Sequence, residues 1–144
     1  MRGLACAAAS AVGGIVALAA CAAPSDQDAQ PWDEPADYVY EATITVFGTT
    51  AGTWRITVDD RAVAAAEPLD ELAEYSAHDY QPALEDFPTL TGLVELYNLG
   101  VADGYRVADL EQADDGTPRR LELDPDENAI DDEYAIDVLG VDVG

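Results

Sequence analysis

The amino-acid types with the most specific chemical meaning lie together near the amino terminus. Leu18, Ala19 and Ala20 directly precede Cys21. This tetrad resembles the bacterial lipobox, in which an apolar residue and two small residues stand before a cysteine whose thiol is diacylated. Cys6 is the competing cysteine, but only five residues precede it, too few for the hydrophobic stretch of an export signal. The sequence therefore predicts a lipid on Cys21.

The residues before Cys21 have the order of an export signal. Arg2 is followed by an uncharged, largely apolar run over residues 3–18 and then by small residues. Residues 22–31 are Ala, Pro, Ser, Asp and Gln, a composition that suits a spacer rather than a packed element. We expect a lipoprotein signal peptide at 1–20, a flexible polar tether at 21–31 and a single small domain at 32–144. Two acyl chains on Cys21 would hold that domain on the extracytoplasmic face of the cell membrane.

A second group of chemically active side chains lies near the carboxyl terminus. Oxygen-bearing side chains recur there at Asp124, Asp126, Asn128, Asp131 and Glu133. Such donors suit a hard cation, and calcium is the one cofactor that the sequence raises. An EF-hand loop needs Gly in sixth place and Glu in twelfth, whereas this segment has Ala in both. The departure favours the competing interpretation, a turn between two strands, and leaves calcium as the alternative.

Catalytic chemistry has little support in the sequence. His78, the one histidine, lies in Ser-Ala-His-Asp, but the members of a catalytic triad converge from separate elements rather than from neighbouring positions. No nucleophile elbow, zinc pattern, phosphate loop or dinucleotide fingerprint is present in the sequence. The residues favour a protein that is not an enzyme. A hydrolase that uses paired carboxylates is the alternative.

Charge is the most extreme property of the composition. The chain has 30 acidic residues and 6 basic residues, all Arg, which gives a formal net charge of −24. This field repels phosphate groups, so we expect no nucleic-acid partner, and contact with lipid is left to the covalent anchor. Acidity alone selects no ligand, because acidic surfaces also keep proteins dispersed. Solubility and genome composition are the favoured explanation, and adaptation to a high-salt habitat is the alternative.

The first half of the domain is expected to form three strands. Residues 38–46 alternate, with Tyr38, Tyr40 and Ile44 among the apolar residues of one face. Residues 47–52 are typical of a hairpin connection, after which residues 54–58 continue the apolar face. Residues 61–66 form the third strand. Because both cysteines lie before the domain, this core is not stapled by a disulfide.

One main helix and three further strands are expected in the second half. Residues 67–88 are interrupted by three prolines, so we expect a loop there, with at most short amphipathic turns around Leu69, Leu72 and Tyr75. Thr89 then caps a helix with a buried stripe at Leu90, Leu93, Val94 and Tyr97 and a stop at Gly100. Strands follow at 105–111, 119–124 and 133–139. The expected fold is α+β, a single antiparallel sheet of about five or six strands in β3-α-β3 order with one main helix packed on one face.

A family resemblance adds to this interpretation. Residues 116–124, Gly-Thr-Pro-Arg-Arg-Leu-Glu-Leu-Asp, and residues 128–134, Asn-Ala-Ile-Asp-Asp-Glu-Tyr, resemble the carboxyl-terminal signature of an uncharacterised family of actinobacterial lipoproteins. The strand that opens with Tyr38-Val39-Tyr40, the hairpin at 54–63 and the Thr-capped helix resemble the same family. The chain departs from it by lacking the cysteine pair that many relatives carry at 48–52 and by the insert at 67–88. The resemblance implies no activity.

The function favoured by these residues is a non-catalytic interaction or ligand-binding module at the cell surface. Its partner would be an envelope protein, a peptide or a small ligand, in addition to the lipid anchor in the membrane. A calcium-stabilised envelope domain is the alternative, and a carboxylate-based hydrolase is the third hypothesis. The sequence leaves the ligand unidentified.

Overall fold

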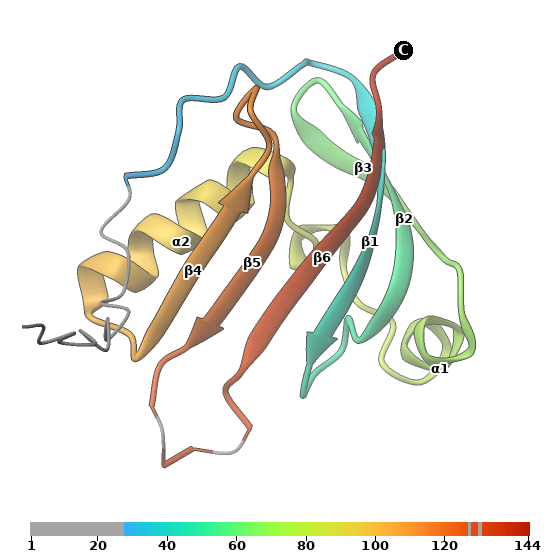
Figure 1. Ribbon diagram of the computed structural model, residues 1–144. Helices are drawn as coiled ribbons and strands as arrows, with labels where there is room; N and C mark the ends of the chain where they lie inside the picture. Colours follow the sequence, from blue (N-terminus) through green and yellow to red (C-terminus); the bar gives the residue numbers. More distant parts are fainter. Residues whose placement is uncertain (1–27, 127, 130) are drawn as a thin grey trace, which may run out of the picture.

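The computed structural model describes residues 28–126, 128–129 and 131–144. Their strands are β1 (Tyr38–Val46), β2 (Gly52–Asp59), β3 (Ala62–Pro68), β4 (Val107–Gln112), β5 (Pro118–Asp124) and β6 (Tyr134–Asp142). Between β3 and β4 the chain forms α1 (Glu71–Asp79), a short 3-10 helix η1 (Leu84–Asp86) and α2 (Leu90–Asp103). All six strands pair antiparallel in the order β3-β2-β1-β6-β5-β4 (Figure 1). The expected α+β class and single antiparallel sheet are confirmed.

The sheet buries one face only. In β1 the side chains of Tyr38, Tyr40, Ala42 and Ile44 are buried, whereas the residues that alternate with them are not, as the alternation in the sequence predicts. Both helices contribute to the core on this face, α1 next to β2 and β3, and α2 next to β4 and β5 (Figure 1). The buried apolar residues form one cluster: Tyr38, Tyr40, Ala42, Ile44, Trp54, Ile56, Val58, Ala73, Phe87, Leu90, Leu93, Tyr97, Leu121, Leu123, Ile136 and Val138.

Helix α2 begins where the sequence predicts and ends later. The Thr89 hydroxyl accepts a hydrogen bond from the Gly92 amide at 3.0 Å, which is the expected N-cap. The predicted stop at Gly100 is wrong, because the helix continues to Asp103 and is closed by Gly104 at a φ of 71°. Gly100 is instead buried within the helix. A Cβ there would lie 3.1 Å from Leu123, so the glycine lets α2 approach β5 closely.

The region predicted as a loop contains a second helix, so the expectation of one main helix is corrected. Asp70 caps α1 by accepting a hydrogen bond from the Ala73 amide at 2.8 Å. It also accepts one from the Thr53 amide of β2 at 2.9 Å. A hydrogen bond with the Thr53 side chain, followed by the backbone bond from Ala73, lowers the pKa of Asp70. The buried side of α1 consists of the small residues Ala73 and Ser76. Leu72 and Tyr75, which we expected on an apolar stripe, are about half exposed.

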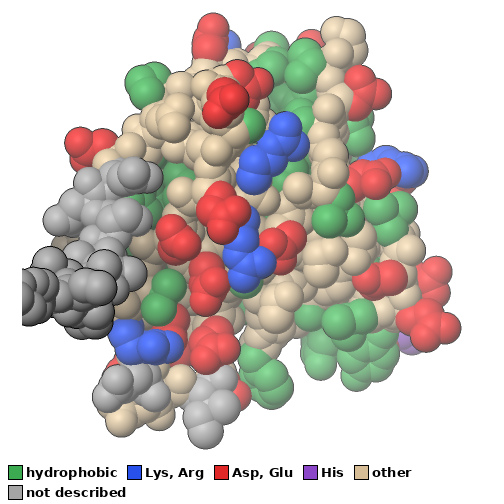
Figure 2. All heavy atoms as spheres, in the orientation of Figure 1, with side chains coloured by type: hydrophobic (Ala, Val, Ile, Leu, Met, Phe, Trp, Pro, Cys, Tyr) green, Lys and Arg blue, Asp and Glu red, His purple; other side chains and the backbone are tan. Residues whose placement is uncertain are grey.

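Within the described ranges no helix packs on the opposite face of the sheet, which carries charged side chains. Arg55 lies 2.7 Å from Glu41 on β1 and 3.9 Å from Glu67 on β3. Arg120 on β5 lies 2.6 Å from Asp137 on β6. Figure 2 shows arginines set among carboxylates on this face. These exposed pairs contribute little stability, but they explain why no apolar layer covers this side.

The first described residues lie against the β4–β5 end of the sheet. The Gln30 amide donates to the Gln112 side chain at 2.7 Å, and the Gln112 side-chain amide donates back to the Gln30 carbonyl at 3.1 Å. Gln112 also donates to the Gly116 carbonyl at 2.6 Å. We name residues 28–32 the amino-terminal strap. The strap is joined to the sheet by the polar side chain of Gln112 and by Ala29 and Trp32, which pack against the core. The signal-peptide prediction lies outside the described residues.

Gly52, the first residue of β2, allows α1 to pack against the sheet. Its φ is 118°, which L side chains rarely adopt, and a Cβ there would lie 2.4 Å from the backbone nitrogen of Ala73. Both the backbone conformation and the contact exclude a larger residue. Gly48, in the same β1–β2 connection, has only the Val46 side chain nearby, at 3.6 Å.

We predict that Gly52→Ala lowers the free energy of unfolding by about 2–4 kcal/mol, because strain and overpacking add. Gly48→Ala is the matched control and is expected to change it by less than about 0.5 kcal/mol. Urea denaturation followed by circular dichroism measures both variants. Equal stabilities for the two variants would contradict the contact between β2 and α1.

Candidate functional site

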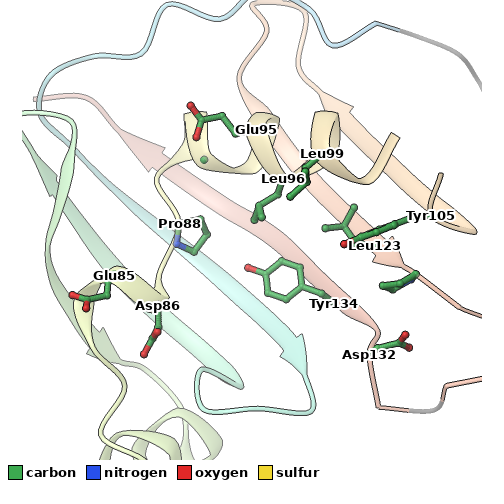
Figure 3. A pocket seen from close by; sticks show the side chains of 12 residues that line it. Glu85, Asp86, Pro88, Glu95, Leu96, Leu99, Tyr105, Leu123, Asp132 and Tyr134 are labelled. Carbon is green, nitrogen blue, oxygen red and sulfur yellow. The ribbon is translucent and has the colours of Figure 1, made fainter. Parts of the chain in front are cut away.

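A groove of about 640 Å³ lies between α2, η1 and the adjoining ends of β5 and β6 (Figure 3). This volume is in the range of pockets that bind small molecules. The residues that line it come from four separate parts of the chain: Glu85, Asp86, Pro88, Gly92, Glu95, Leu96, Leu99, Tyr105, Leu123, Pro125, Asp132 and Tyr134.

The floor of the groove is apolar. Leu123 and Tyr134 face each other on the paired strands β5 and β6, and Figure 3 shows Leu96 and Leu99 projecting from α2 toward them. Leu99 is 52% exposed although it lies beside this apolar surface. An apolar side chain left open in a concave site gains free energy when a ligand covers it.

The groove is held in place by contacts beneath it. The Tyr40 hydroxyl donates to the carbonyl of Pro88, and the Leu90 amide donates to the Tyr38 hydroxyl at 2.8 Å. These bonds fix the start of α2 on β1. Gly100 fixes the other end of the helix close to β5. The groove is therefore formed before any ligand binds.

Tyr134 lies in the middle of the groove (Figure 3). Its burial raises its pKa to about 12, so its hydroxyl keeps its proton at neutral pH and can donate a hydrogen bond there. Burial also raises the pKa values of Tyr38 and Tyr40 in the core below.

The edge of the groove is acidic. Glu85 and Asp86 lie on η1, Glu95 on α2 and Asp132 just before β6, and no basic residue is among the lining residues that the structure describes. Asp86 accepts a hydrogen bond from the Ala83 amide at 2.8 Å. Within the described ranges none of the four carboxylates forms an ion pair with Arg or His. The groove therefore combines an apolar floor with unneutralised negative charge.

The predicted calcium ligands are spread along the β5–β6 connection. Asp124 is buried and forms an ion pair with Arg106. Asp126 accepts bonds from the Asn128 amide and side chain at 2.9 and 3.0 Å, which lower the pKa of Asp126. Asp131 and Glu133 are exposed. In the part of the chain that the structure describes, no three His, Cys, Asp or Glu residues are grouped to hold a metal ion. Calcium stays a prediction, since residues 127 and 130 lie outside that part.

Two other candidates lie away from the groove or outside the description. The His78 side chain is 87% exposed at the end of α1, where it lies 3.5 Å from Asp79. Cys21 lies outside the described residues, so its lipidation stays a prediction. No helix within the described ranges is long and apolar enough to cross a membrane.

Comparison with known proteins places this site within a family. A family model described as a family of unknown function, DUF6174, matches residues 26–143. The chain belongs to the DUF6174 family. The match spans every strand and helix given above, so the groove lies within the DUF6174 domain. No curated protein matches the chain, and no solved structure does. Membership of an uncharacterised family is confirmed, while its actinobacterial origin, its lipoprotein character and the carboxyl-terminal signature stay predictions.

The groove was not predicted from the sequence, although helix α2 carries one sign of it. Leu96 and Leu99 extend the apolar surface of α2 beyond the stripe of Leu90, Leu93 and Tyr97 that faces the core. A helix on an open sheet needs only one such stripe. The additional leucines therefore mark a second apolar side, which lines the groove.

The raised tyrosine pKa values predict a loss of stability in alkali. A tyrosine whose pKa is higher in the folded state stabilises the fold fully below the unfolded value near 10. That contribution falls as the pH rises from about 10 through the folded pKa, with a slope of about 1.4 kcal/mol per pH unit for each such tyrosine. We expect the slope to be smaller in Tyr134→Phe. Urea denaturation between pH 8 and pH 11.5 measures it, and a constant stability over that range would contradict the burial of these hydroxyls.

Proposed function

We propose that this protein is a membrane-tethered extracytoplasmic lipoprotein that binds a ligand with an apolar body in the groove and catalyses no reaction on it. The observation that carries the binding proposal is the open apolar floor, above all Leu99, which is half exposed beside Leu96, Leu123 and Tyr134. Covering such surface releases about 25 cal/mol for each Å² removed from water.

The preformed shape of the groove supports the same proposal. Because α2 is fixed to the sheet at both ends, a ligand would enter without first ordering the protein, which keeps the entropic cost of binding low. The hollow between the amino-terminal strap and β4 is a weaker candidate. Its lining is mostly polar, with Asp28, Gln30, Asp109, Glu111 and Gln112 among its residues.

The tether proposal rests on the sequence. The Leu-Ala-Ala-Cys tetrad at 18–21 follows a short apolar stretch, as in bacterial lipoproteins. The acidic domain gives anionic lipid headgroups no basic surface to bind, so membrane attachment would depend on the covalent lipid.

The binding proposal is tested with N-phenyl-1-naphthylamine, a neutral dye whose fluorescence increases in apolar surroundings. We expect saturable binding that Leu99→Ser weakens about fivefold, because the dye loses part of its apolar contact. Val101→Ser is the matched control, since Val101 is 50% exposed on α2 but does not line the groove. An equal loss in both variants, or none in either, would reject the groove as the site.

The tether is tested by Cys21→Ala. We expect this variant to leave the membrane fraction and to lose all labelling by a fatty-acid probe, because the thiol is the predicted point of lipid attachment. Cys6→Ala is the control and should keep both properties. Labelling that survives in Cys21→Ala contradicts the tether.

A further inference from the structure

One carboxylate of the groove lacks the partner that its burial requires. Oδ1 of Asp132 is buried and has no hydrogen-bond donor within the described residues. A buried acceptor without a donor destabilises the folded protein, and more so when it carries charge. Asp132 also lines the groove. Asp132 as a whole is only partly buried, so a turn of its side chain can bring this oxygen from its covered position to a donor supplied by a ligand in the groove, which removes an existing cost.

The other acids of the groove act separately rather than as one cation site. Glu85 and Asp86 lie on η1, on the other side of Tyr134 from Asp132 (Figure 3). No group of three His, Cys, Asp or Glu residues within the described ranges is arranged to hold a metal ion. Their charge therefore favours a cationic ligand that extends over the apolar floor rather than a compact metal ion.

We propose that the ligand of the groove is a small amphiphilic amine, whose primary ammonium group donates a hydrogen bond to Asp132 Oδ1 while its apolar body covers Leu96, Leu99 and Tyr134. This inference rests on the proposed binding function and specifies its ligand class. A groove of about 640 Å³ accommodates a molecule of this size.

The Asp132 carboxylate and the apolar floor together distinguish this ligand from chemically similar molecules. A quaternary ammonium carries the same charge but has no N–H to donate, so it leaves Asp132 Oδ1 without a partner. An anionic amphiphile is repelled by the four carboxylates, because no basic residue among the described lining residues balances them. A neutral alcohol covers the floor and can donate one hydrogen bond to the carboxylate, but it carries no positive charge, so it lacks the attraction between opposite charges.

Four probes with the same eight-carbon chain separate these contributions: octylammonium, octyltrimethylammonium, octan-1-ol and octanoate. Titration calorimetry gives the affinities, and amide chemical shifts at Leu96, Leu99 and Tyr134 report whether the probe is in the groove. We expect octylammonium to bind about tenfold more tightly than octan-1-ol, because only the ammonium adds an opposite charge to the hydrogen bond. Octyltrimethylammonium should bind more weakly than octylammonium, and octanoate should not bind.

Asp132→Asn tests the residue directly. It should remove the preference for octylammonium over octan-1-ol while leaving the binding of octan-1-ol unchanged. Asp131→Asn is the matched control, because it removes the same charge from an exposed neighbour that does not line the groove. A preference that survives in Asp132→Asn, or that both variants lose equally, overturns the role of Asp132.

The outcomes distinguish the two proposals. If octan-1-ol and octylammonium bind the groove equally well, the ammonium proposal fails and the groove remains a binding site for apolar ligands. If none of the four probes shifts the groove amides, both proposals fail. Selective binding of octylammonium in the groove, lost in Asp132→Asn alone, supports both.

Discussion

The structure depends on a sheet that can be buried on one face only. Rows of arginine and carboxylate side chains occupy the other face, so both helices must pack on the same side. Six strands spaced about 4.8 Å apart extend over about 24 Å, and two helices of about 10 Å diameter leave part of that width uncovered. In the connection from η1 to α2, Phe87 packs on Trp54 of β2 and the Pro88 carbonyl accepts from Tyr40 of β1, whereas the ends of β5 and β6 line the groove. The groove is this uncovered part.

The same constraint explains which features of the fold the sequence could predict. The strictly alternating strand at 38–46 matches β1, and the Thr89 cap matches the start of α2, because each depends on local chemistry alone. Helix α1 escaped prediction for a different reason. Its buried side consists of Ala73 and Ser76, which give no hydrophobic stripe, while Leu72 and Tyr75 point outward. The prolines at 68, 82 and 88 all lie outside the two α-helices and so interrupt neither.

The candidate site could not be predicted in the same way. Its lining residues are distributed from Glu85 to Tyr134, and only the return of β6 to the centre of the sheet brings β5 and β6 opposite α2. With 30 acidic residues in the chain, no single carboxylate stands out by type. Among the described residues, Oδ1 of Asp124 and Oδ1 of Asp132 are both buried without a donor, but only Asp132 lines the groove, and this depends on three-dimensional surroundings. The end of α2 could not be predicted for the same reason. Gly100 lies within the helix and not at its end, and its role in close packing depends on Leu123, which lies beside it in the fold.

The amino-terminal strap has a mechanical consequence. Any pulling force applied through the residues before Asp28 reaches the sheet along the strap, where the reciprocal hydrogen bonds between Gln30 and Gln112 carry the load first. Gln112 is the last residue of β4, an edge strand, so tension would act on the rim of the sheet and not on the central pair β1 and β6. Beyond these two hydrogen bonds, Ala29 and Trp32 of the strap pack against the core. Tension that lengthens the connection would therefore uncover apolar side chains at the rim of the core, whereas no strap residue lines the groove.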